Sequence, residues 1–106
     1  ETLDNLIERI NQAFGMNLTE EDRLLFEQIA GEFKNIGDLK DRANSNSFED
    51  FKNSFAKNNF MRGLIKRKAV NQNIFDKVIN EPTFKDFIVN EIARELYKEF
   101  NEATSL

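Results

Sequence analysis

The sequence contains no cysteine and no histidine among its 106 residues. Without cysteine there is no disulfide bond and no thiolate metal site, and the composition is compatible with a reducing compartment. The absence of histidine removes the commonest general base near neutral pH and excludes catalytic triads built on imidazole. No apolar run approaches the roughly 20 residues that span a bilayer. We therefore expect a soluble, cytoplasmic protein.

Glycine and proline are scarce, with four glycines and one proline. Scattered glycines cannot build a phosphate-binding loop, so nucleotide hydrolysis is not expected. Carboxylates are plentiful, but consecutive ones such as Glu20, Glu21 and Asp22 point in different directions on a helix and do not converge on a metal ion. We expect no catalytic, cofactor-binding or metal-binding residue in this chain.

A chain of this length is expected to bury roughly 60–65% of the surface that its unfolded form exposes, enough for one modest core. It begins at Glu1 without an initiator methionine, and its first residues already have the apolar spacing of a helix. We therefore expect residues 1–106 to be a single helical domain, the C-terminal fragment of a much longer chain.

Helix signals divide the first half of the chain. Apolar spacing predicts a helix over about residues 2–14, which Gly15 ends by adopting a left-handed conformation. Thr19 is the predicted N-cap of a second helix, which has an acidic first turn and ends near Lys34. A short helix over residues 38–43 could follow.

Ser47 is the predicted N-cap of the next helix, which carries phenylalanines at i, i+3 and i+7 along one face. Asn58 and Asn59 are expected to interrupt it before a further short helix. Gly63 weakens that short helix by roughly 1 kcal/mol relative to alanine.

The last third of the chain has the clearest pattern. Asn71 or Asn73 begins a helix, and Pro82 marks its end or the start of the next one. Apolar residues then recur at helical spacing over residues 84–100, and no segment shows a convincing strand alternation. The fold class predicted is all-α, an irregular bundle of five to seven helices around a Phe-rich core.

Eleven phenylalanines could suggest stacking with nucleic-acid bases. Their helical spacing favours core packing instead, because large aromatic side chains let a small domain bury enough area. The predicted core phenylalanines are Phe14, Phe33, Phe51, Phe55, Phe75, Phe84 and Phe87.

Charge is unevenly distributed. The net charge of −4 argues against general nucleic-acid binding, yet residues 51–75 contain six basic residues and no acidic one. This segment could be an ordinary solvated face with internal ion pairs, a contact for the DNA phosphate backbone, or a contact for an acidic protein. The candidate contact residues for DNA or a partner are Lys57, Arg62, Lys66, Arg67 and Lys68.

The last predicted helix carries an acidic stripe at i, i+4 spacing. Like charges at this spacing repel one another, and neighbouring basic residues soften the repulsion. The stripe is either a solvated acidic face or a ridge for docking a partner. Its residues are Glu91, Glu95, Glu99 and Glu102.

Four segments, in this order and at this spacing, resemble the C-terminal helical domain of the R subunit of type I restriction-modification enzymes. They are LTEEDRLLFEQIAGEF from Leu18, NSFEDFK from Asn46, NIFDKVINEPTF from Asn73 and EIARELYKEF from Glu91. The residues that carry the resemblance are Leu18, Thr19, Glu20, Glu21, Asp22, Arg23, Phe26, Glu27, Asn46, Ser47, Phe48, Phe51, Lys52, Ile74, Phe75, Phe84 and Tyr97.

The resemblance implies that the parent enzyme is an ATP-dependent DNA translocase and endonuclease, which uses ATP and Mg²⁺ to cleave unmodified DNA. The motifs for ATP binding and DNA cleavage in that family are not in this chain. The resemblance therefore implies a non-catalytic assembly domain that docks the motor on the methyltransferase core of M and S subunits, near duplex DNA.

Two alternatives come from other classes of protein. One is a stand-alone helical protein-interaction module that uses the last helix. The other is a DNA-backbone-binding domain that uses the basic segment 57–68.

Overall fold

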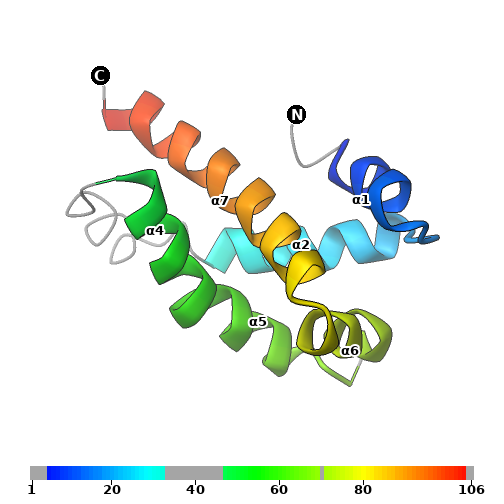
Figure 1. Cartoon of the computed structure of the whole chain (residues 1–106). Coiled ribbons are helices and arrows are strands. Elements are labelled where there is room, and N and C mark those ends of the chain that lie inside the picture. Colours follow the sequence, from blue (N-terminus) through cyan, green and yellow to red (C-terminus); the bar gives the residue numbers. More distant parts are fainter. Residues whose placement is uncertain (1–4, 33–46, 70, 105–106) are drawn as a thin grey trace.

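The computed structural model describes residues 5–32, 47–69 and 71–104, and every regular element in these ranges is a helix (Figure 1). The prediction of an all-α bundle with a Phe-rich core is confirmed there. The predicted helix over residues 38–43, the predicted helix end near Lys34 and the predicted core residue Phe33 lie outside the described residues.

Helix α1 (Leu6–Phe14) ends at the predicted glycine. Gly15 has φ 63° and ψ 38°, and its N–H donates to the carbonyl of Asn11. The N–H of Met16 donates to the same carbonyl over 3.3 Å. Glycine adopts this left-handed conformation without a Cβ penalty, so α1 ends sharply and the chain turns towards α2.

Helix α2 (Glu20–Glu32) begins directly after Thr19. The carbonyl of Thr19 accepts hydrogen bonds from the N–H groups of Asp22 (3.0 Å) and Arg23 (3.2 Å). The N–H of Thr19 donates to the Asp22 carboxylate over 2.8 Å, which is the carboxylate half of a capping box. The sequence signal at Thr19 therefore corresponds to the observed start of α2.

Helices α4 (Phe48–Phe55) and α5 (Met61–Lys66) are joined by the π-helical turn η2 (Ala56–Phe60) into one continuous helix, the α4–α5 rod. Ser47 caps the rod as predicted, since its Oγ accepts from the Asp50 N–H over 3.2 Å. The prediction that Asn58 and Asn59 interrupt the helix is wrong, because both residues lie within η2.

The π turn keeps one side of the rod in the core. A five-residue step separates the buried residues Phe55 and Phe60, and in a regular α-helix it would rotate Phe60 by about 140°. In η2 the N–H of Met61 instead donates to the carbonyl of Ala56, five residues back. This wider turn returns Phe60 to the side of Phe55, and burying its ring stabilises the rarer hydrogen bonding.

Helix α6 (Gln72–Asn80) follows Asn71, whose carbonyl accepts from the Phe75 N–H over 3.0 Å. Pro82 is the first residue of α7 (Pro82–Thr104), a position where the missing N–H breaks no helical hydrogen bond. Of the alternatives left open by the sequence, Asn71 precedes α6 and Pro82 begins the last helix.

Helix α7 crosses the bundle and packs against α4, α6, α1 and α2 (Figure 1). It contributes buried side chains at helical spacing: Phe84, Ile88, Ile92 and Leu96. The predicted core phenylalanines that are buried are Phe51, Phe55 and Phe84, and those partly buried against the core are Phe14, Phe75 and Phe87. Phe26 and Phe60, which the prediction did not include, are fully buried.

Gly63 lets α2 approach the rod closely. A Cβ on this residue would lie 3.1 Å from Cγ1 of Ile29, which is itself fully buried. The low helix propensity of Gly63 is therefore balanced by close packing between α2 and α5.

Candidate functional site

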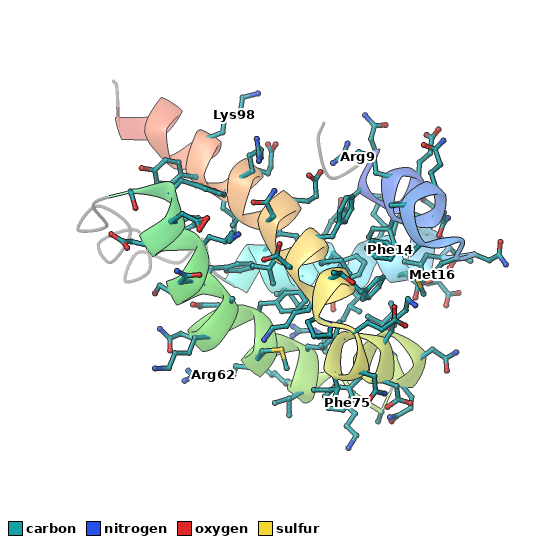
Figure 2. The ribbon with its side chains drawn as sticks, viewed as in Figure 1. Arg9, Phe14, Met16, Arg62, Phe75 and Lys98 are labelled. Carbon is teal, nitrogen blue, oxygen red and sulfur yellow. The ribbon has the colours of Figure 1, made fainter. Side chains whose placement is uncertain are left out.

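Three basic residues line the outer side of the α4–α5 rod. The buried residues Phe51, Phe55, Phe60 and Leu64 define its core-facing side. The residues two positions further along the chain lie on the opposite side, and all of them are exposed: Asn53, Lys57, Arg62 and Lys66. We call Lys57, Arg62 and Lys66 the basic row. Figure 2 shows Arg62 projecting away from the bundle.

The π turn η2 determines which basic residues share the outer side of the rod, just as it determines which apolar residues face the core. Lys57 and Arg62 are separated by the same five-residue step as Phe55 and Phe60, which η2 converts into a single wide turn. Arg62 and Lys66 are one ordinary α-helical turn apart. The rod therefore presents three cations in succession along one face.

Arg67 and Lys68, the other two predicted contact residues, interact with other residues of the protein. The Nε of Arg67 donates to Oε1 of Gln28 on α2 over 3.1 Å, and its Nη1 donates to the carbonyl of Gly63 over 3.0 Å. The ammonium of Lys68 lies 5.0 Å from the centroid of the Phe75 ring. The structure thus places Lys57, Arg62 and Lys66 in one row along the outer side of the rod, and turns Arg67 and Lys68 towards other parts of the fold. Lys66 also has an interaction within the protein.

Lys52, a further basic residue of the rod, also contacts the fold. Its ammonium lies 3.4 Å from a carboxylate oxygen of Glu49 and 3.5 Å from one of Asp86 on α7. Its side chain is only 14% exposed. Lys52 therefore links α4 to α7 and is not part of the basic row.

The predicted acidic ridge is only partly open to solvent where its side chains are described. Glu91 forms an ion pair with Arg9 of α1 and has a side chain 20% exposed. Glu95 is buried, with 8% exposure. The side chains of Glu99 and Glu102 lie outside the described residues. Docking through this ridge stays a prediction.

Acidic residues in the first turn of α2 interact with residues of the same helix or with Thr19, which precedes it. The Nε of Arg23 donates to Glu20 over 3.0 Å and a second guanidinium nitrogen pairs with Glu27, while Asp22 accepts from Thr19.

Within residues 5–32, 47–69 and 71–104, no group of three or more acidic, histidine or cysteine residues could hold a metal ion. No helix in these ranges is long and apolar enough to cross a membrane.

Two surface hollows lie away from the basic row. One, of about 430 Å³, is bounded by the link between α1 and α2 and by the start of α6, with Asn17, Asp22 and Asn71 among its lining. The other, of about 450 Å³, lies where α1 ends beside the start of α7, and its lining includes Phe14, Pro82 and Phe87. Neither hollow includes a residue that the sequence singled out as a contact for DNA or a partner.

Comparison with known proteins does not assign this chain to a family. No family model matches it, and no curated protein and no solved structure shows a significant match.

The sequence predicts that Arg62 and Lys66 project together, one turn apart, with Lys57 nearby, but it did not lead us to predict the π turn that aligns Lys57 with Arg62. The available signal was the spacing of buried apolar residues, with steps of four, five and four residues from Phe51 to Leu64. One five-residue step within a run of four-residue steps is the pattern expected of a single π turn.

Proposed function

We propose that this chain is a non-catalytic docking domain, of the kind found at the C-terminus of type I restriction enzyme R subunits. In that role it attaches an ATP-dependent DNA motor to the methyltransferase core. The parent enzyme would use ATP and Mg²⁺ to translocate and cleave unmodified DNA, and M and S subunits would be its partners.

The observation that carries the proposal is the place of the resembling residues in the fold. Ser47 and the Thr19–Asp22 pair cap α4 and α2. Phe26, Phe51 and Phe84 are buried, and the ring of Tyr97 lies 5.6 Å from Phe48 and 5.4 Å from Phe51. A pattern located at caps and core residues supports a shared fold, and a shared fold supports the docking role only as an analogy.

The proposal is tested by mixing the purified chain with the cognate methyltransferase core and measuring binding by calorimetry and co-elution. We expect a complex that forms without DNA and without ATP. A chain that is folded by circular dichroism but does not bind the core would contradict the proposal.

Charge-neutralising variants test the predicted ridge. Glu99→Gln with Glu102→Gln should weaken binding if the end of the last helix forms the interface. Glu8→Gln with Asp76→Asn is the matched control, because both residues are exposed on α1 and α6 and the change in charge is identical. Equal losses for the two pairs would show that net charge, and not the ridge, determines binding.

A further inference from the structure

We propose that the basic row of Lys57, Arg62 and Lys66 binds the phosphate backbone of duplex DNA without reading its sequence. The proposal rests on the geometry and charge of the rod, and it holds whether or not the domain docks on a methyltransferase core.

The first support is alignment. In an unbroken α-helix, Lys57 and Arg62 would point about 140° apart and could not contact the same linear ligand. The π turn η2 brings them to one side of the rod, and Lys66 follows one turn later. Three cations in line along a convex helix match a linear array of negative charges.

The second support is the chemistry of the side chains. Lysine and arginine offer only hydrogen-bond donors, and the exposed amides of Asn53 and Asn58 beside them can also donate to phosphate oxygens. Protein interfaces are depleted in lysine and enriched in aromatic residues, methionine and arginine. The row has two lysines and one arginine, with the exposed Ile65 beside Arg62 and Lys66, and its charged groups favour phosphate as the ligand.

The third support is the state of the charges. Among the described residues, no carboxylate forms an ion pair with Lys57 or Arg62, and Glu49 at the start of the rod pairs with Lys52. The net charge of −4 acts over longer distances, and salt screens exposed charges beyond about 8 Å at physiological ionic strength. Lys57 and Arg62 therefore keep their charges available to a phosphate, and Lys66, which also has an interaction within the protein, follows one turn later.

The test is fluorescence anisotropy of a labelled, arbitrary DNA duplex with the 106-residue chain, over a series of salt concentrations. Three phosphate contacts predict that log K falls with log salt at a slope of about −2.7. Affinity should then fall about 40-fold between roughly 50 and 200 mM salt. Failure to detect binding at the lowest salt would overturn the proposal.

Two variants distinguish an effect of the alignment of the three cations on DNA binding from an effect of the net charge of the protein. The triple variant Lys57→Gln, Arg62→Gln and Lys66→Gln should lose binding. The double variant Arg62→Asn with Asn80→Arg keeps the net charge and moves one cation to the exposed end of α6, where the helix dipole favours it. Its salt slope should be shallower by about 0.9. An unchanged slope in the double variant would overturn the proposal.

The matched control for the triple variant is Lys85→Gln, Arg94→Gln and Lys98→Gln, which removes three cations from α7. Lys98 lies towards the C-terminal end of that helix, away from Arg62 (Figure 2). The control should keep at least half of the unmodified affinity. Equal losses in both triples, or equal binding of polyglutamate in place of the duplex, would show a general response to negative charge and contradict the proposal.

Discussion

The side chain of Asn11 and the backbone of Leu18 are joined by two hydrogen bonds. The Leu18 N–H donates to Oδ1 of Asn11 over 2.8 Å, and Nδ2 of Asn11 donates to the Leu18 carbonyl over 3.2 Å. Because Asn11 lies on α1 and Leu18 precedes α2, one amide side chain satisfies both polar groups of a linking residue. This pair and the left-handed Gly15 together hold the short link between the two helices.

We expect Asn11→Ala to lower the free energy of unfolding by about 1–3 kcal/mol, because it leaves a partly buried N–H and carbonyl without their partner. Urea denaturation measures the loss. Gln12→Ala is the control, since Gln12 is exposed on the same helix and should change stability by less than about 0.5 kcal/mol. Equal effects of the two substitutions would contradict a structural role for the amide pair.

Gly31 and Gly63 should respond differently to alanine. Gly63→Ala places a Cβ against the fully buried Ile29, and the overpacking cost of about 1–3 kcal/mol exceeds or cancels the gain of up to about 1 kcal/mol in helix propensity. Gly31→Ala meets nothing within 4 Å and should gain up to about 1 kcal/mol from helix propensity. Thermal unfolding of both variants checks the order, and a more stable Gly63→Ala would show that α2 moves away at little cost.

Deletion of Asn58 should be tolerated. It would convert the five-residue step from Phe55 to Phe60 into an ordinary four-residue step, so that the rod becomes a regular α-helix with the same side in the core. We expect a free energy of unfolding within about 1 kcal/mol of the unmodified chain, or higher, because the rarer π hydrogen bonding is removed. Chemical denaturation measures it.

Deletion of Asn90 is the control for that experiment. Helix α7 has no π turn at this position, so the deletion would rotate Ile92 and Leu96 by about 100° relative to the first part of the helix. Removing two such aliphatic side chains from a core costs more than about 4 kcal/mol. If both deletions unfold the chain, then η2 is required for a reason other than keeping Phe55 and Phe60 on the same side of the rod.

The cap of α4 gives a further test. Ser47→Ala should cost about 1 kcal/mol, because the Asp50 N–H loses its acceptor at the start of the rod. Ser54→Ala, within the same helix, should be close to neutral, because the gain in helix propensity offsets the loss of an exposed 3.4 Å hydrogen bond from Asn58. Helical circular dichroism on heating distinguishes the two, and an equal loss from both would exclude capping as the cause.

Local signals predicted much of the helical framework. The positions of Gly15, Thr19 and Ser47 correspond to observed helix boundaries, because backbone conformation and capping depend on a few neighbouring residues. Pro82 signalled a boundary for the same reason, although it did not say which helix it belonged to. Asn58 and Asn59 misled the prediction, since their preference for turns is small compared with the burial of Phe60.

The candidate site was predicted in composition, but its geometry only in part: the spacing of Arg62 and Lys66 puts them on one face with Lys57 nearby, whereas the π turn that aligns Lys57 with them was not predicted. The absence of acidic residues between Phe51 and Phe75 is visible in the sequence and located the basic segment. Which of its cations share a face depends on the register of the rod, and that register is set by the core. Arg67 turned towards Gln28 of α2, a contact between residues 39 positions apart that no local pattern indicates.

The sequence by itself determined that this protein is helical, where most described helices begin and end, and which short segment concentrates positive charge. These properties follow from interactions among residues within a turn or two of one another. Only the tertiary structure decided that α4 and α5 form one rod and that Lys57, Arg62 and Lys66 lie along its outer side. The physical reason is that burial of Phe55 and Phe60 in the same core outweighs the local preference for a break.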